Sequence, residues 1–376
     1  MPGAWRTSVA PFQQEIMDVF NDPQIETVVF MKSAQVGATE ILNNICGFYV
    51  DQEPSTILIL QPTLSMAQTW SKDRLAPMLR DSPKLKGKVK DPRSRDSGNT
   101  VLYKSFPGGH LSIVGSNSAA GLASRPIRIV LADEVDRYEV TKEGDAISLA
   151  TKRTNTYFNR KIFITSTPTI KGLSRIEQAY ENSDQRRFYV PCPHCKHEQT
   201  LQWKYLIWND NDPSTAAYTC EECGAVIEET KKPWMLARGK WKAHSATNKT
   251  AGFHINELYS VWRTWPQMVE DFLAAKKNPE MLRVFVNTSL GETFEDQGEQ
   301  IETEGLLSRR SNYDEMSFPN SVLVLTAGVD TQKDRLEVQV IGWKANYEAY
   351  VIEHRIIWGD PSAGLVWDEL DQFLAT

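Results

Sequence analysis

Residues 28–41 read VVFMKSAQVGATEI, and this stretch decides the fold. The apolar run at 28–31 predicts a buried strand, and the segment from Thr39 to Tyr49 carries apolar residues at helical spacing. A strand, a loop and a helix in this order can cradle nucleotide phosphates, because the N–H groups of the loop and the helix start point at the anion. On this motif alone, an ordinary strand-to-helix turn is the alternative interpretation.

The loop departs from the usual phosphate-loop pattern G-x-x-x-x-G-K-[ST]. Gly37 and Thr39 hold their places, but Ala38 stands where the lysine belongs and Lys32 replaces the first glycine. A lysine has a long, flexible stem, so Lys32 can reach the same phosphates from the start of the loop. Thr39 would offer its hydroxyl to Mg²⁺. The residues predicted to bind ATP here are Lys32, Ser33, Ala34, Gln35, Val36, Gly37, Ala38 and Thr39.

Two later strands strengthen the ATPase prediction. Residues 127–136 read IRIVLADEVD, in which Asp133 would hold Mg²⁺ and Glu134 would polarise the attacking water. Residues 161–169 read KIFITSTPT, and Ser166 and Thr167 at the end of this run would sense the γ-phosphate and couple its loss to neighbouring parts. A strand followed by a solvated turn is the plain alternative for the acid pair. Ligands bind at the carboxyl ends of strands in α/β sheets, so the three runs together favour an ATPase.

Four of the five cysteines form two C-x2-C pairs, Cys192 with Cys195 and Cys220 with Cys223, with 24 residues between the pairs. Each pair lies in a tight-turn context, which lets two sulfurs point at one tetrahedral metal. Because disulfides are rare in cytoplasmic proteins, we predict a structural Zn²⁺ rather than cross-links. The fifth, Cys46, lies on an apolar helix face and is predicted to be a core residue.

Composition limits the classes of partner. The chain has 376 residues, 41% of them hydrophobic, and a formal net charge of −6, so contact with nucleic acid has to be local. Residues 71–104 hold ten basic and four acidic residues; a solvated loop and a DNA-facing surface are the two interpretations. No apolar run approaches the ~20 residues of a membrane span, and the first residues lack a signal-peptide pattern.

The rest of the chain divides by pattern. Residues 231–291 are predicted to be mostly helical, with tryptophans that serve core packing or, alternatively, a DNA surface. Residues 292–304 hold six acids and no base, which predicts an exposed linker. From Ser321 three β-rich runs predict an antiparallel meander, followed by a helix over 362–374.

Taken together, these motifs resemble the large terminase subunit of tailed bacteriophages, in its lambda-like branch. The matching stretches are KSAQVGAT, FPGG at 106–109, GSNSAAGLASRPIR, LADEVDRY, STPT, VPCPHC and NTSLGE, and the resemblance spans about residues 5–376. It implies an α/β fold: a P-loop NTPase of the ASCE type with a mostly parallel sheet, a zinc-ribbon insertion, and the start of a ribonuclease-H-like α/β nuclease domain, truncated here.

The resemblance and the patterns together give a domain plan. The expected parts are a P-loop ATPase motor core at 1–187, a zinc-ribbon module at 188–230, a helical subdomain completing the motor at 231–291, an acidic linker at 292–320, and the N-terminal part of the nuclease at 321–376.

The resemblance also implies roles for residues outside the loop. Phe12 and Gln13 resemble an adenine-reading element, although Phe12 equally fits the start of an amphipathic helix. Arg125 resembles an arginine that acts in a neighbouring subunit's active site; Arg128 competes for that role, and a structural ion pair is the plain alternative. Asp330 ends the first strand of the nuclease pattern and would bind a catalytic Mg²⁺ or Mn²⁺.

The function implied is a packaging motor, encoded by a virus or prophage, that acts in the host cytoplasm. It would hydrolyse ATP to move double-stranded DNA into a procapsid, with a metal-dependent endonuclease half that cuts concatemers. The implied partners are double-stranded DNA, the small terminase subunit, the portal and procapsid, and further copies in a ring, with no membrane. A helicase-like or repair ATPase, or a decayed non-catalytic prophage remnant, is the alternative.

Two departures from the family pattern shape the expectations. Relatives carry lysine where Ala38 stands, so Lys32 would act alone. The remaining nuclease acids of the family lie downstream of residue 376, so we expect the chain as given not to cut DNA.

Overall fold

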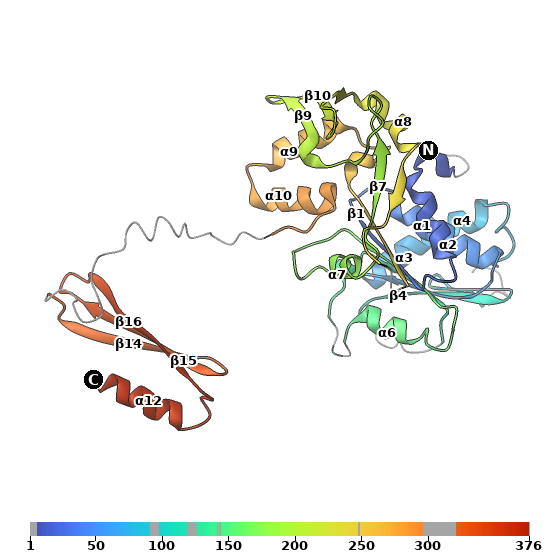
Figure 1. Ribbon diagram of the computed structural model, residues 1–376. Coiled ribbons are helices and arrows are strands. Elements are labelled where there is room, and N and C mark those ends of the chain that lie inside the picture. Colours follow the sequence, from blue (N-terminus) through green and yellow to red (C-terminus); the bar gives the residue numbers. More distant parts are fainter. Residues whose placement is uncertain are drawn as a thin grey trace. The chain divides into compact units, whose positions relative to one another are not determined.

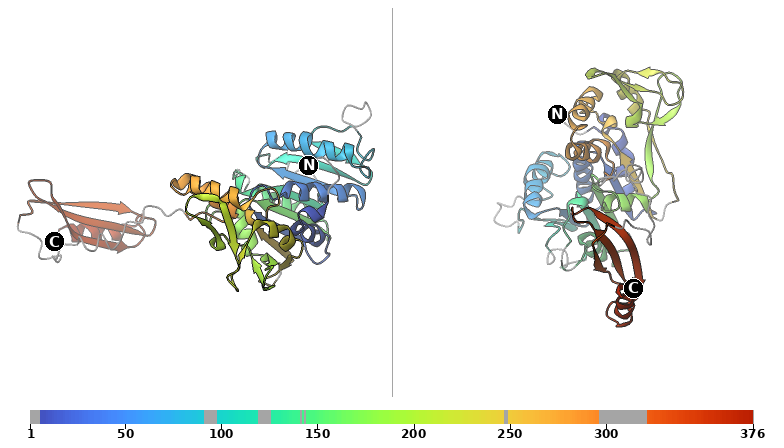
Figure 2. Two further views of the ribbon diagram at one scale, coloured as in Figure 1. Left: turned by 90° about the horizontal axis from the view of Figure 1, so that it is seen from above. Right: turned by 90° about the vertical axis from the view of Figure 1, so that its left-hand side faces the viewer.

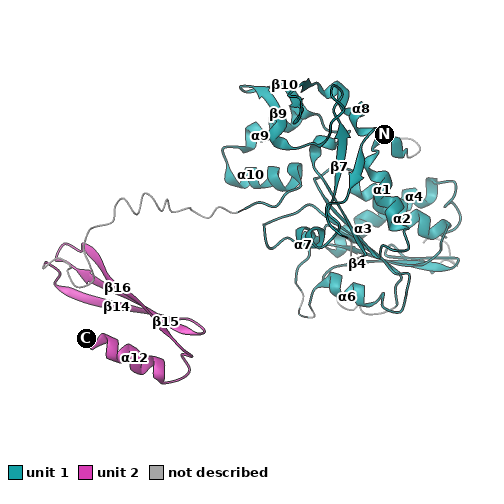
Figure 3. Ribbon diagram, in the orientation of Figure 1, with its two compact units in different colours: residues 1–296 teal, residues 297–376 magenta. Residues whose placement is uncertain are grey.

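The computed structural model of the chain describes residues 6–90, 98–118, 126–140, 142, 144–246, 249–295 and 321–375. The chain forms two compact units, residues 1–296 and residues 297–376 (Figure 3). Within the described residues, no helix combines the length and the apolar character needed to cross a membrane.

A ten-stranded sheet forms the centre of the first unit (Figure 1). Its strand order is β12-β7-β13-β1-β6-β5-β2-β4-β3, with β8 paired to β7 off this path. Strands β7, β13, β1, β6, β5, β2 and β4 are parallel, whereas β3, β8 and β12 are antiparallel to their neighbours. The bounds are β1 Thr27–Lys32, β2 Thr56–Gln61, β3 Tyr103–Phe106, β4 Gly109–Gly115, β5 Ile129–Asp133, β6 Lys161–Ser166, β7 Arg186–Pro191, β8 Glu198–Thr200, β12 Lys240–Lys242 and β13 Thr250–Ile255.

The central strands are apolar on both faces because both faces are covered. In β1, Val28 and Phe30 join one core while Val29 and Met31 join the other. The first core includes side chains of α1 (Phe12–Phe20), α2 (Ala38–Asp51) and α3 (Leu64–Trp70), and the second those of α6 (Ala146–Lys152) and α7 (Arg175–Glu181) (Figure 1, Figure 2). This is the mostly parallel, two-sided α/β sheet that the sequence predicts.

Short helical segments complete this unit. A 3-10 turn at Thr7–Val9 precedes α1, and a π-helical turn at Ser71–Leu75 joins α3 to α4 (Ala76–Asp81). A 3-10 turn at Val135–Arg137 follows β5. Strand β13 is followed by a 3-10 turn at Glu257–Tyr259, helices α9 (Trp265–Ala275) and α10 (Pro279–Phe285), and a π-helical turn at Val286–Leu290.

The cysteine-bearing module extends from β7 and β8. It holds a 3-10 turn at Trp203–Tyr205, the three-stranded sheet β9 (Leu206–Asn209), β10 (Asp212–Thr219) and β11 (Val226–Ile227), a 3-10 turn at Glu229–Lys231, and helix α8 (Lys232–Leu236). The chain then returns to the main sheet as β12.

The expectation that 231–291 is mostly helical is wrong in one respect. This stretch supplies β12 and β13, and β13 pairs in parallel with β1 along its whole length, from Thr27 opposite Thr250 to Lys32 opposite Ile255. The six residues TAGFHI are nearly all buried, as a central strand requires. A run this short cannot be assigned to strand or helix from periodicity alone.

The second unit is the predicted antiparallel meander. Strands β14 (Val324–Thr331), β15 (Arg335–Trp343) and β16 (Ala349–Trp358) pair in sequence order, and α12 (Leu365–Leu374) follows them. Its small core joins Leu336, Val338 and Ile357 of the sheet to Val366 and Leu370 of the helix.

Candidate functional site

The polar residues predicted to bind nucleotide meet at one edge of the main sheet. Strands β1, β6 and β5 are adjacent and parallel, so their carboxyl ends lie side by side. Lys32 ends β1, Ser166 ends β6 and Asp133 ends β5. This is the edge at which parallel α/β sheets bind ligands.

An ion pair joins the two most important predicted residues. The Lys32 Nζ donates a hydrogen bond to the Glu134 Oε1 at 2.8 Å, and the two side chains are only 6% and 20% exposed. Burial raises the pKa of Glu134, but the charge and hydrogen bond of Lys32 outweigh it, so the pKa is lowered. Glu134 is therefore a carboxylate at neutral pH. Its backbone is left-handed (φ 53°), a conformation that costs a non-glycine residue ~1–2 kcal/mol.

The pKa of the neighbouring carboxyl group, on Asp133, is shifted in the opposite direction. Its side chain is buried, and its Oδ2 accepts a hydrogen bond from the Gln61 Nε2 at 3.2 Å. Burial, reinforced by the charge of Glu134, raises the pKa of Asp133 to about 6. Two adjacent acids thus compete for the positive charge of Lys32, and a cation beside Asp133 would relieve that competition.

Backbone hydrogen bonds to the end of β13 and to the segment that follows α10 hold the start of the phosphate loop. The Ser33 N–H donates to the Ile255 carbonyl at 2.9 Å, and the Ala34 N–H donates to the Thr288 carbonyl at 2.7 Å. Gly37 caps α2 with a φ of 82°, which glycine adopts without strain. The first two loop amides are therefore bonded to protein, and the turn at Gly37 aims the start of α2 at the site.

Residues 166–169, the predicted coupling segment, contact Glu134 and Asp136. The Thr167 Oγ1 lies 3.5 Å from the Glu134 Oε2, and the Asp136 N–H donates to the Ser166 Oγ at 3.2 Å. Asp136 also accepts from the Thr169 Oγ1 at 2.9 Å. These contacts join the loop after β5 to the end of β6.

Residues 287–295 connect the coupling segment to the phosphate loop. The Asn287 Nδ2 donates to the Thr169 and Glu292 carbonyls at 2.7 and 2.9 Å, and the Phe294 N–H donates to the Thr169 carbonyl at 2.9 Å. The neighbouring Thr288 carbonyl holds Ala34, as described above. The predicted linker begins at 292, but residues 292–295 belong to the first unit. Glu292 and Glu295 are exposed, as the acid content predicts, while the backbone of Phe294 pairs with Thr169.

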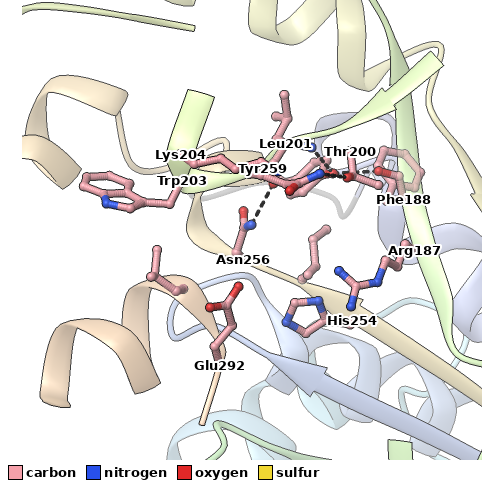
Figure 4. Close-up of a pocket in the computed structure, with 13 residues that line it drawn as sticks. Arg187, Phe188, Thr200, Leu201, Trp203, Lys204, His254, Asn256, Tyr259 and Glu292 are labelled. Carbon is pink, nitrogen blue, oxygen red and sulfur yellow. Dashed lines mark hydrogen bonds between the residues drawn. The ribbon is translucent and has the colours of Figure 1, made fainter. Parts of the chain in front are cut away.

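A pocket of about 290 Å³ lies on the other side of β13 from β1 (Figure 4). It is lined by side chains from β7, the start of the cysteine module, β13 and residues 290–292, and none of the predicted site residues lines it. His254 in its wall contacts the Gly291 carbonyl through Nε2 at 2.9 Å, and burial together with Arg187 lowers the pKa of His254 to about 4. A Cβ on Gly291 would lie 2.8 Å from the Ser33 nitrogen, so the backbone at Gly291, beside this wall, packs closely against the start of the phosphate loop.

The side chains of Phe12 and Gln13 contact different parts of the first unit. Phe12 is fully buried, and its ring packs edge-on against Phe188 with centroids 6.2 Å apart, so the amphipathic-helix alternative describes it. The Gln13 Nε2 donates to the Val36 carbonyl at 2.7 Å, which ties α1 to the phosphate loop. Its Oε1 is buried and has no hydrogen-bond partner among the described residues.

Of the two arginines considered, Arg125 lies outside the described residues. Arg128 precedes β5, at the end of the strand opposite Asp133. Its guanidinium pairs with Glu53 at 2.6 Å and donates to the Ser55 Oγ at 2.8 Å. Arg128 therefore forms a structural ion pair, which was the alternative to a catalytic role.

The four predicted cysteines come together. Their Sγ atoms all lie within 4.8 Å of one another, with Cys192 to Cys223 at 4.0 Å and Cys195 to Cys220 at 3.8 Å. Four sulfurs around a tetrahedral Zn²⁺ with bonds of ~2.3 Å would be ~3.8 Å apart, so the set fits such an ion. Cys46 is buried in the first core, as predicted.

Comparison with known proteins decides the family. Residues 1–241 match the family model described as "Phage terminase large subunit gpA, ATPase domain", which covers more than half of the chain. The chain belongs to this terminase family. Residues 250–376 match the model described as "Terminase large subunit gpA, endonuclease domain". The resemblance noted in the sequence motifs is thus confirmed.

Two curated terminase large subunits are similar along almost the whole chain. The protein from Enterobacteria phage P21 is 33% identical over 390 residues, covering 96% of this chain and 60% of that relative. The protein from Escherichia phage lambda is 31% identical over 385 residues, covering 95% and 60%. The chain therefore spans about 60% of the length of these relatives.

Solved terminase structures show weaker similarity. The large terminase ATPase domain of Thermus phage P74-26 gives a TM-score of 0.44 at 14% identity, covering 74% of this chain and 92% of that one. A large terminase from another thermophilic bacteriophage gives a TM-score of 0.39 at 10% identity, covering 96% and 73%.

Within this terminase, Asp330 lies on β14, in an exposed position. Its partner across the sheet is Glu337, so the two side chains share one face. Glu337 is paired with Arg335 at 2.7 Å. Among the described residues, the cysteine cluster is the one group of three or more candidate ligands close enough to share a metal.

The sequence motifs did not identify Gln61, Asn287 or Thr288. Gln61 had a local signal, because it is a polar residue at the end of the apolar run TILILQ. Asn287 and Thr288 lie in the family-like stretch NTSLGE, but their contacts with Thr169 and Ala34 depend on the folded chain.

Proposed function

We propose that the chain is the ATP-hydrolysing motor part of a genome-packaging machine that moves double-stranded DNA into a procapsid. The observation that carries the proposal is the buried Lys32–Glu134 pair at the end of β1, next to Asp133 and facing the coupling segment. A lysine and two carboxyl groups thus lie together at the edge where α/β sheets bind ligands, which supports the proposal.

The residues divide the chemistry between them. The Ser33 and Ala34 amides are bonded to protein, so the loop amides from Gln35 to Thr39 and the start of α2 bind the phosphates, and Lys32 neutralises the terminal phosphate. Glu134, ionised at neutral pH, orients and polarises the attacking water. A γ-phosphate that takes over the Lys32 amine frees the Glu134 carboxylate for this task. Thr167, in contact with Glu134, passes the change to the coupling segment.

Mg²⁺ fits the site as a partner of Asp133 and Thr39. A buried carboxylate with a raised pKa and a half-exposed hydroxyl at the start of α2 are the hard oxygen ligands that Mg²⁺ prefers. When bound, the ion would neutralise charge on the transferred phosphate. The cysteine cluster would hold Zn²⁺ in a structural role, because four thiolates leave no open position for chemistry.

The proposal for the whole protein rests on the family. We infer a second, metal-dependent endonuclease activity, with Asp330 as one Mg²⁺ or Mn²⁺ ligand. The inferred partners are DNA, the small terminase subunit, the portal and procapsid, and other copies in a ring, in the cytoplasm of the infected host. Arg125 is the candidate for an arginine acting in a neighbouring copy's site.

A phosphate-release assay with and without double-stranded DNA tests the motor. Wild-type protein should hydrolyse ATP with DNA stimulation, and Lys32→Ala and Glu134→Gln should each lower turnover at least a hundredfold. Lys249→Ala is a matched control, because that lysine is 68% exposed in a surface pair with Glu26 at the start of the sheet. Normal turnover by Lys32→Ala would refute the proposed site, and strand separation in place of DNA translocation would favour a helicase.

A further inference from the structure

The aromatic residue beside the phosphate loop is Trp262, which no sequence motif marks. A Cβ placed on Gly37 would lie 3.0 Å from Cη2 of the Trp262 ring and 2.3 Å from the Gln13 Nε2. The indole and the carboxamide therefore both approach the last loop residue before α2. The Trp262 side chain is 49% exposed at this place.

Hydrogen bonds and an ion pair hold the backbone around Trp262, and this fixes where its ring begins. The Trp262 N–H donates to the Ser260 Oγ at 3.2 Å, and the next residue, Arg263, pairs with Glu257 at 2.9 Å. The Lys232 Nζ holds the Arg263 carbonyl at 2.9 Å. Helix α9 then starts at once with a capping box on Thr264.

Burial alone does not explain this tryptophan. Three residues further on, Trp265 is fully buried and donates its indole N–H to the Leu258 carbonyl at 3.1 Å. Trp262 instead leaves half of its surface in water beside a phosphate loop. A large, flat and half-exposed aromatic ring is the kind of surface on which nucleotide bases stack.

The aromatic residue that the sequence suggested for this role is not accessible. Phe12 is fully buried against Phe188. Gln13, the other residue suggested there, is also fully buried, and its Nε2 donates to the Val36 carbonyl at 2.7 Å, so Gln13 supports the loop from inside. Of these three side chains, Trp262 is the one that a base can reach.

We propose that Trp262 is the stacking platform for the purine base of the nucleotide. The inference rests on the proposed function, because it requires the triphosphate to occupy the loop from Ser33 to Thr39. Stacking is tolerant of base identity, so Trp262 supplies affinity for any purine.

Binding of ATP and of inorganic tripolyphosphate, measured by calorimetry on the full chain, tests the platform. Trp262→Ala should weaken ATP and ADP about tenfold to a hundredfold, since a base stacked on an aromatic side chain contributes that range. Tripolyphosphate has no base, so its affinity should stay unchanged, and Trp262→Phe should recover most of the loss. Trp358→Ala is the matched control, because that tryptophan is 65% exposed in the second unit.

The outcomes separate the inference from the proposed function. Unchanged ATP affinity in Trp262→Ala overturns the stacking platform while leaving the motor proposal intact. Equal weakening of ATP and tripolyphosphate also overturns it, because the ring would then be shaping the phosphate loop. A wild-type chain that binds neither ligand overturns the proposed function and, with it, the inference.

Discussion

Replacing Asp133 by asparagine should make the first unit more stable at neutral pH while abolishing ATP turnover. Asp133 is buried next to a second carboxylate, and its side chain accepts a hydrogen bond from the neutral Gln61 amide. Asparagine keeps the shape and an acceptor for Gln61 but removes the negative charge. The substitution therefore isolates the electrostatic cost of the predicted metal ligand.

The magnitude follows from the pKa of Asp133, which burial raises from 3.8 to about 6. An acid with a higher pKa in the folded state binds its proton more tightly there, so stability falls as pH rises from ~4 to ~6. Each pKa unit corresponds to ~1.4 kcal/mol, so the cost is about 3 kcal/mol at pH 8 and roughly half of that at pH 5. Asp133→Asn should recover this amount at pH 8 and progressively less below pH 6.

Glu134→Gln is a control that should change the free energy of unfolding in the opposite direction. Although burial raises the pKa of Glu134, Lys32 lowers it further, so the ionised form stabilises the folded chain above the usual titration range of glutamate. Removing that charge leaves Lys32 buried without its partner at 2.8 Å, so Glu134→Gln should destabilise at neutral pH.

Urea unfolding, followed by tryptophan fluorescence in chelator-containing buffers between pH 5 and pH 8, measures both variants. The difference between the Asp133→Asn and wild-type unfolding free energies should grow with pH. A variant less stable than wild type at pH 8, or a difference that does not change with pH, would refute the reasoning, because either result means that Asp133 is not an electrostatic burden in the folded state.

Three further predictions concern other parts of the first unit. Cys220→Ser should lower the zinc content of purified protein, measured by metal analysis, and lower the melting temperature, because three thiolates hold the ion less well than four. Asn287→Ala removes hydrogen bonds to the Thr169 and Glu292 carbonyls; unfolding titrations should show a loss of ~1–3 kcal/mol, and turnover should fall more than ATP affinity. Gly37→Ala should destabilise by ~1 kcal/mol or more and weaken nucleotide binding, since the new Cβ meets Gln13 at 2.3 Å and the φ of 82° disfavours alanine; calorimetry would check both effects.

The sequence alone predicts the parts of the site that depend on local pattern. The apolar run before Lys32 and the one before Asp133 are strands within a residue or two of the expected bounds, because each is a short, continuous apolar stretch bounded by polar residues. The paired cysteines meet because each C-x2-C turn fixes two sulfurs locally. The meander of the second unit follows from its alternating strands and polar turns.

The sequence could not reveal the contacts that join distant segments. Nothing local marks β13 as the neighbour of β1, or places the Thr288 carbonyl on the Ala34 amide. Nothing local distinguishes the exposed Trp262 from the buried Trp265 three residues later. These features depend on which elements the whole chain brings together, and local propensity carries no information about that.

The limits of the first unit are set by its sheet and not by the boundary between the two family matches. The endonuclease match begins at residue 250, yet β13 starts there and lies between β1 and β7 in the sheet of the first unit. The Ile255 carbonyl at its end holds Ser33 of the phosphate loop, and residues 287–294 hold both Ala34 and the coupling segment. A chain ending near 250 would therefore lose a central strand and the rear support of its own nucleotide site.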